Sequence, residues 1–193
     1  FPPRALTGYD THINGHGTFC ASASSQQNTL TTPPWKAFDK SLDNSHGYNT
    51  WSNFTDANYN GTDNTYNPVA TTGGGIILGA GAVYGEWIKL ELPYKINLKY
   101  MKLNTMAPND LTRIPEDFKV YGSNDNSNWT ELISVTGRDR KIFETTHDAR
   151  TDSMYKYFGV VVTKISGQNN YFRILELRYF GTREQGQSVL HDG

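Results

Sequence analysis

The segment Gly85-Glu86-Trp87-Ile88-Lys89-Leu90-Glu91-Leu92 decides the fold class of this chain. Its aliphatic residues Ile88, Leu90 and Leu92 alternate with charged or amphipathic ones, so an extended strand here has one apolar and one polar face. Pro93-Tyr94 then turns the chain, and a second apolar run follows. Alternation with a period of two, followed by a turn, predicts antiparallel β-structure.

Similar apolar runs recur on both sides of this segment, separated by Gly, Asn, Asp and Pro residues. Helical periodicity is almost absent, and one short helical turn is predicted at Trp35–Asp39. The spacing is typical of an all-β, antiparallel β-sandwich of about eight strands. The predicted strands are Thr18–Ser24, Thr50–Phe54, Trp87–Leu92, Ile96–Leu103, Phe118–Ser123, Trp129–Val135, Tyr157–Ile165 and Arg173–Phe180.

The chain of 193 residues fits one β-domain of generous size. We expect the sandwich at residues 18–181, a lead-in at 1–17 and a polar linker or tail at 182–193. Residues 40–75 are dense in Asn, Asp, Thr and Tyr and are expected to form loop. The sequence has no signal peptide and no apolar run of about 18 residues, so no transmembrane helix is expected. The abrupt ends predict a segment of a longer polypeptide.

The composition disfavours one class of function and indicates how the core is packed. Eighteen basic and 19 acidic residues give a net charge of −1, which disfavours binding to nucleic acid. A single cysteine, Cys20, excludes a disulfide within the chain and is expected to be a small buried residue. Aromatic residues make up 13% of the chain, so the core should pack with rings. The four tryptophans expected in that core are Trp35, Trp51, Trp87 and Trp129.

Motifs of catalysis are missing from the sequence. There is no Gly-x-Ser-x-Gly, no phosphate-binding Gly-x-x-x-x-Gly-Lys and no His-Glu-x-x-His. The five histidines show no zinc spacing. Paired carboxylates that meet only in the fold remain open. The sequence therefore favours a binding module over an enzyme.

Six phrases in order resemble the coagulation factor 5/8 type C domain, or discoidin domain, which overlaps the family 32 carbohydrate-binding modules. The phrases are Ala21–Ser25, Lys36–Asp39 leading to Thr50–Ser52, Gly85–Leu92, Arg113–Asp125, Asn128–Leu132 and Ile174–Gly181. Together they cover residues 18–181. The opening Phe1–Thr7 is also similar to the lead-in of such domains in large DNA viruses of algae and in phage tail proteins.

The resemblance implies an antiparallel jelly-roll sandwich, galactose-binding-domain-like, with its ligand site in loops at one end. It implies a non-catalytic, extracellular or virion-surface module that binds a cell-surface or matrix glycan. Two features depart from the family. One cysteine forbids the disulfide that joins the ends of many animal members. The loop between Asp39 and Thr50 is long, and residues 53–84 look like an insertion.

Many sugar-binding members of the resembled family hold a structural calcium ion beside the loop after the first helical turn. Carried over by motif, the candidate ligands are Asp39, Asp43, Thr50 and Glu176. Calcium takes six to eight oxygen ligands from carboxylates, hydroxyls and carbonyls, which this set could supply. The alternative is that Asp39 and Asp43 cap turns while Glu176 pairs with an arginine.

Sugars need aromatic faces against their C–H surfaces and polar groups for their hydroxyls. In sugar-binding relatives an arginine at the position of Arg113 contacts ligand hydroxyls; the alternative is an ion pair with Glu116 or Asp117. Phe172 could lie at a loop tip or in the core. The expected ligand-binding residues are His12, Tyr48, Asn49, Asn109, Arg113, Asn170, Tyr171 and Phe172.

Two other functions remain open. Some relatives insert apolar loop tips into anionic membranes, and Phe54 or Ile76-Ile77-Leu78 could do so here. The lack of a basic collar argues against this membrane role. A purely architectural module would instead pack against neighbouring subunits of a particle or fibre, and a large exposed apolar patch would favour it.

Overall fold

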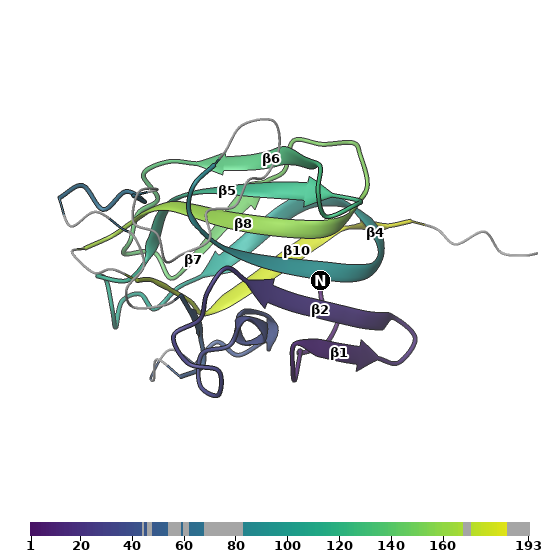
Figure 1. The fold of residues 1–193 in the computed structure, drawn as a ribbon, viewed down its shortest axis with the longest axis horizontal. Coiled ribbons are helices and arrows are strands. Elements are labelled where there is room, and N and C mark those ends of the chain that lie inside the picture. The colour runs from purple at the N-terminus through teal and green to yellow at the C-terminus, as the bar shows by residue number, and fades with distance from the viewer. Residues whose placement is uncertain are drawn as a thin grey trace, which may run out of the picture.

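The computed structural model describes residues 1–43, 45, 48–53, 59, 62–67, 83–167 and 171–184. These residues form an antiparallel, almost all-β sandwich, which confirms the predicted fold class (Figure 1). The elements are β1 Asp10–Ile13, β2 Gly17–Ala23, the 3₁₀ helix η1 Pro34–Phe38, β3 Trp51–Ser52, β4 Glu86–Asn104, β5 Pro115–Ser123, β6 Trp129–Val135, β7 Glu144–Asp148, β8 Tyr155–Ile165, β9 Arg173–Ile174 and β10 Glu176–Arg183.

Strand β4 belongs to both layers of the sandwich. Its first part, up to Glu91, pairs with β2 and β8. Its second part, from Ile96, pairs with β10 and β7 and keeps one pair with β8, Ile96 with Tyr155. Figure 1 shows β4 running along one layer, bending and returning along the other. The bend contains the predicted turn at Pro93-Tyr94, where proline has no N–H to donate to a ladder. The two strands predicted here are therefore one continuous element.

A bulge resets the alternation in the second half of β4. Gly181 pairs with Leu98 while Phe180 pairs with Tyr100, so Lys99 is left over. An extra residue moves all later side chains to the other face. Leu98 and Met101 therefore both point into the core, and Lys99 is exposed.

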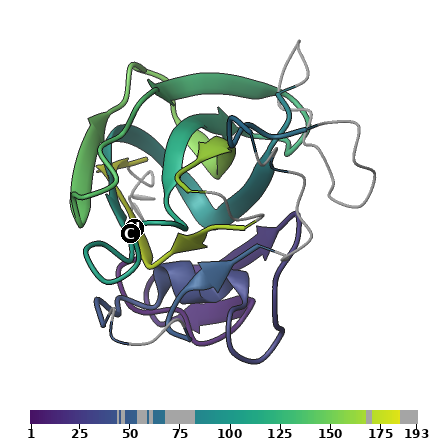
Figure 2. The same cartoon turned by 90° about the vertical axis from the view of Figure 1, so that its left-hand side faces the viewer.

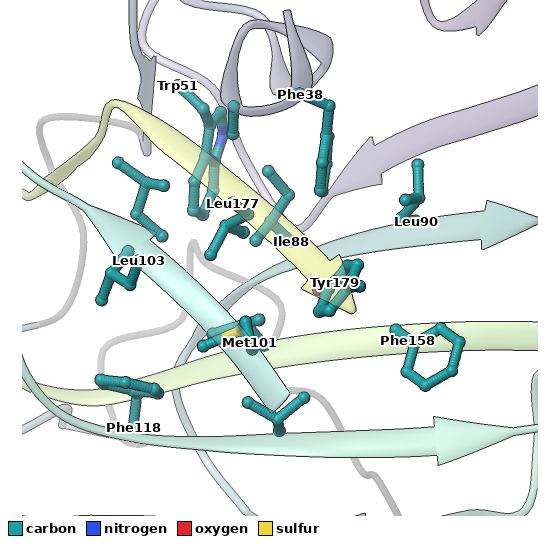
Figure 3. Close-up of a cluster of buried hydrophobic side chains, with 14 of the residues drawn as sticks. Phe38, Trp51, Ile88, Leu90, Met101, Leu103, Phe118, Phe158, Leu177 and Tyr179 are labelled. Carbon is teal, nitrogen blue, oxygen red and sulfur yellow. The ribbon is translucent and has the colours of Figure 1, made fainter. Parts of the chain in front are cut away.

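The core between the two layers is aromatic and aliphatic, as expected. Figure 3 shows Phe38, Trp51, Phe158 and Tyr179 among side chains from both layers, and all four are fully buried. Of the four tryptophans, Trp51 alone is completely enclosed. Trp87 and Trp129 pack on the outer face of the larger layer, against Tyr121 and Val161, because their strand positions alternate with the core positions. The expectation of a core role was therefore wrong for these two.

Segments expected to be loop also contribute to the fold. In the lead-in, β1 pairs with β2, Leu6 is 1% exposed, and the Leu6 N–H donates to the Phe38 carbonyl at 3.0 Å. Tyr59 and Tyr66, from the polar stretch, are buried and form an edge-to-face pair at 5.4 Å. Strand β7 was not predicted either. In the described part of the chain, no helix is long and apolar enough to cross a membrane.

Candidate functional site

Four loops meet at one end of the sandwich, onto which Figure 2 looks. They follow β2, η1, β4 and β8. Backbone hydrogen bonds join them: the Gln27 N–H donates to the Ser52 carbonyl at 2.8 Å, and the Arg173 N–H donates to the Arg113 carbonyl at 2.9 Å. Gly167 has a φ of +75°, and a Cβ on it would lie 2.7 Å from the Thr112 carbonyl oxygen. Glycine thus permits the loops after β4 and β8 to touch.

A pocket of about 410 Å³ lies among these loops. Its walls are Gln27, Asn28, Thr31, Thr32, Tyr48 and Arg173. The set combines two amides, two hydroxyls, one phenol ring and one guanidinium. Tyr48 is 65% exposed, so its ring is accessible from solvent.

The loop after β2 is held in shape by its own polar side chains. The Asn28 side-chain carbonyl accepts hydrogen bonds from the Leu30 N–H at 2.8 Å and the Thr31 N–H at 3.1 Å. The Thr32 hydroxyl oxygen accepts from the Asn28 N–H at 3.0 Å. Such side-chain turns fix a loop without regular structure. The pocket wall is therefore organised before any ligand arrives, which lowers the entropic cost of binding.

Two arginines share one carboxylate and one ring beside the pocket. Arg113 Nη1 lies 2.7 Å from Asp110 Oδ2, whereas Arg173 Nη1 lies 4.0 Å from the same oxygen. The Tyr171 ring lies 4.7 Å from Arg113 Cζ and 5.7 Å from Arg173 Cζ. Burial acts to raise the pKa of Asp110, but hydrogen bonds from Thr112 and Arg113 outweigh it and lower that pKa. Asp110 is therefore a carboxylate at neutral pH, already committed to Arg113 and Thr112.

Arg173 retains unused hydrogen-bond donors. Its Nε atom is buried without a partner, and within the described residues its guanidinium makes no hydrogen bond. The side chain is 19% exposed and lines the pocket. The exposed part of this guanidinium could donate to a ligand in the pocket without first giving up a hydrogen bond to a described residue.

The structure brings together some of the predicted ligand-binding residues. Tyr48 lines the pocket, and Arg113 and Tyr171 lie beside it. The acid that pairs with Arg113 is Asp110, not the expected Glu116 or Asp117.

The three predicted asparagines lie apart from the lining residues of the pocket or outside the described chain. Asn49 donates to Asp43 Oδ2 at 3.3 Å, and Asn109 is exposed next to Asp110. Asn170 lies outside the described residues.

Two predicted ligand residues lie elsewhere. Phe172 is fully buried, with its ring 5.3 Å from that of Trp51, because it alternates with Tyr171 along the chain. His12 lies on the β1–β2 hairpin, away from the pocket, with Nδ1 3.3 Å from the Thr18 hydroxyl. Arg173, Gln27 and Asn28 were missed, because only the fold brings these dispersed polar residues together.

The candidate calcium ligands differ in burial. Glu176 is fully buried; its Oε2 accepts from the Lys40 N–H at 3.0 Å, and its Oε1 has no partner in the described residues. Burial raises the pKa of Glu176 to about 8, with nearby Asp39 adding to the effect. Asp43 instead is exposed and accepts from the Ser45 N–H at 2.9 Å.

No three acidic, histidine or cysteine side chains converge on a metal position among the residues the structure describes. A calcium ion here would therefore rely on Asp39 and Glu176 together with hydroxyl and carbonyl oxygens, the ligands calcium accepts. The unpaired Glu176 Oε1 fits that role, and buried Thr50 supplies a hydroxyl in the same loop region. The donor set is compatible with calcium without Asp43.

Solved structures of sugar-binding modules share this fold. The family 32 module of Clostridium perfringens NanJ, solved with galactose, matches with a TM-score of 0.56 and 12% identity over 83% of this chain and 92% of that one. A Clostridium perfringens module solved with GalNAc-β-1,3-galactose matches with a TM-score of 0.58 and 14% identity over 84% and 95%. Chitosan-binding module 1 from a Paenibacillus sp. IK-5 chitosanase/glucanase gives 0.57 and 19% over 92% and 99%.

At these identities the likeness establishes the fold. No family model matches the sequence, and no curated protein matches it. The discoidin-like, family 32-like architecture inferred from the six sequence phrases is therefore confirmed by three-dimensional structure.

Proposed function

We propose that this chain is a non-catalytic carbohydrate-binding module that holds a glycan in the pocket lined by Tyr48 and Arg173. One observation carries the proposal: a preformed pocket of about 410 Å³ at the loop end combines an exposed ring with planar hydrogen-bonding groups. The sugar complexes of proteins with the same fold support it.

The chemistry of the pocket suits a sugar ring. Tyr48 presents a flat apolar surface with a polar tip, against which C–H groups of a pyranose can stack. Gln27 and Asn28 can each donate and accept, as hydroxyl groups require. Within the described residues, the Asn28 amide nitrogen makes no hydrogen bond, so it remains available to a ligand. Arg173 adds donors in a planar fork.

The module would attach a larger secreted or virion-surface protein to cell-surface or matrix glycans. A single small pocket that takes one or two sugar rings binds weakly, and several displayed copies would supply avidity. We also propose that calcium, held by Asp39, Glu176, Thr50 and backbone carbonyls, stabilises the loop after η1. Lys40, at the start of that loop, has a φ of +62° and donates its N–H to Glu176.

The test is a glycan-array screen of the wild-type chain beside Tyr48→Ala, run with calcium and with a chelator. Tyr48 is 65% exposed, so its replacement should leave the fold intact while weakening sugar binding by about tenfold, the value of one lost stacking contact. Tyr84→Ala is the matched control, because Tyr84 is also exposed, at 45%, and does not line the pocket.

Silence of the folded wild type on every glycan would contradict the sugar proposal and favour the architectural role. Binding that Tyr48→Ala leaves unchanged would move the site away from this pocket.

One observation favours a membrane-binding alternative. Leu30, at the tip of the loop after β2, is 85% exposed, and Leu42 is 46% exposed in the loop after η1. Apolar loop tips can insert into lipid, but insertion without a basic collar is marginal. Sedimentation with phosphatidylserine vesicles decides between the two functions, since only membrane insertion would be lost in Leu30→Ser.

A further inference from the structure

The described side chains around the pocket carry more positive than negative charge. None of the six described residues that line it is acidic, while Arg173 carries a full positive charge. Its nearest carboxylate, Asp110, is 4.0 Å away and is bonded at 2.7 Å to Arg113 instead. One carboxylate thus faces two guanidinium groups, which leaves an excess positive charge at the pocket wall.

Two other acids near these loops contact groups other than Arg173. Asp43 accepts hydrogen bonds from Ser45 and from the Asn49 side chain. Glu86, below the loop after β2, is fully buried and accepts from the Ser25 hydroxyl at 2.6 Å. Neither carboxylate contacts Arg173.

The Arg173 side chain is also held in place. Its backbone pairs with Ser52 through β9 and β3, and its N–H donates to the Arg113 carbonyl. Its guanidinium lies 5.7 Å from the Tyr171 ring centroid and is only 19% exposed. A guanidinium fixed in this way presents parallel N–H groups that match the two oxygens of an anion, and it loses little entropy on binding.

We propose that this pocket selects acidic glycans, with Arg173 binding a negatively charged group of the sugar. This inference rests on the proposed carbohydrate function and names its ligand class. A carboxylate on a uronic acid and a sulfate ester share the required chemistry, since both present two oxygens to the planar fork. Amino sugars carrying a free ammonium group would be repelled by Arg173.

The experiment compares acidic oligosaccharides with partners that lack the charge. The wild-type chain is titrated calorimetrically with a trigalacturonic acid and its methyl ester, with a sulfated and an unsulfated galactose trisaccharide, and with a chitosan oligomer. Arg173→Gln and Arg173→Lys are measured in parallel. Arg140→Gln serves as the matched control, because Arg140 is an exposed arginine outside the pocket. Thermal melting of each variant verifies that it is folded.

The expected result is that at least one acidic sugar binds about tenfold or more tightly than its uncharged partner, as a charge-assisted bidentate contact implies. Arg173→Gln abolishes this preference while retaining the weaker binding of the uncharged sugar. Arg173→Lys keeps the charge but loses the fork, so it retains part of the preference. The pair with the larger difference in affinity, uronic acid against methyl ester or sulfated against unsulfated trisaccharide, identifies the anion that Arg173 binds.

Two results would overturn the inference in distinguishable ways. If neutral sugars bind as well as acidic ones, and Arg173→Gln weakens both equally, the pocket is a sugar site without charge selection and the proposed function stands. If no oligosaccharide binds and the glycan array is also silent, the proposed function fails and the inference fails with it.

Discussion

Arg173 and Glu176 are close in sequence, yet they lie in two regions that differ in solvent access. Arg173 lines the pocket, 19% of its side chain is exposed, and its guanidinium makes no hydrogen bond to the described residues. Glu176, beneath the loop after η1, has an acceptor oxygen without a partner and is fully buried. A group that solvent can reach can await a ligand, whereas a buried carboxyl must either keep a proton, as the raised pKa of Glu176 allows, or keep a cation in the folded protein. This difference fits the two proposals made above, an exchangeable glycan in the first region and a resident calcium ion in the second.

The largest expected effect on stability comes from a substitution in η1, which covers the buried region around Glu176. Phe38→Ala deletes a fully buried ring that packs 6.3 Å from that of Tyr179. The cavity should lower the free energy of unfolding by about 3–5 kcal/mol, measured by urea denaturation. Leu30→Ala, at an exposed position, should change it by less than about 0.5 kcal/mol. A loss below about 1 kcal/mol in Phe38→Ala would show that η1 does not anchor this region.

Stabilisation by calcium should depend on the region of Glu176 and not on the pocket. At about 100 times its dissociation constant, it should raise the free energy of unfolding by about 2.7 kcal/mol, seen as a higher melting temperature. Glu176→Gln should abolish the increase because the amide cannot supply the same charge. Arg173→Gln and Asp43→Asn should keep it, since neither residue belongs to the proposed ligand set. An increase that persists in Glu176→Gln would place the ion elsewhere.

A smaller effect on stability is expected from protonation of His147. This residue lies in neither region, so its pH dependence is independent of both proposed sites. Its ring packs 5.1 Å from that of Phe118, and its Nε2 lies 2.8 Å from the Thr145 hydroxyl. Burial, then the charge of Arg138, lowers the pKa of His147 to about 4, while Asp148 opposes the shift. The unfolded chain therefore binds a proton between pH 6.5 and 4 that the folded chain does not, so stability is lost as the pH falls through this range.

The loss from His147 should be about 1–2 kcal/mol, less than the full shift implies because the ring is partly exposed. Urea denaturation at pH 7, 5.5 and 4 measures it, and His147→Gln should reduce the loss by that amount. His12→Gln, on the exposed hairpin, serves as the control substitution. Identical pH profiles for wild type and His147→Gln would show that the ring is protonated equally in both states.

The sandwich was predictable where strands alternate strongly. The pattern from Trp87 to Leu92 located the core face of β4, and β6 has its predicted bounds, Trp129–Val135. Strand β1 was missed because Asp-Thr-His-Ile is short and has one aliphatic residue, although Thr11 and Ile13 are buried. Strand β7 was missed because Glu-Thr-Thr-His-Asp is polar and has no fully buried residue. The bulge at Lys99 depends on pairing with β10, which no local pattern reports.

The residues of the candidate site were predictable only in part. Tyr48 followed from the aromatic and polar residues of its loop, and Arg113 and Tyr171 followed from the family resemblance; all three lie at the loop end. Arg173 could not be singled out, because its role depends on two distances: Asp110 is closer to Arg113 than to Arg173. Phe172 was misassigned because neighbouring residues in an extended segment point to opposite sides. Sequence alone does not reveal which of the two faces the solvent.

The path of β10 has a mechanical consequence for a module that holds a glycan. The strand begins at Glu176, three residues after the pocket residue Arg173, and ends at Arg183, near the bend of β4, where the Glu184 N–H donates to the Lys95 carbonyl. Tension between a bound glycan and the chain beyond Arg183 would therefore pull along β10. Its hydrogen bonds to β4 lie across that direction and would be loaded together in shear, which resists rupture better than peeling them apart one at a time.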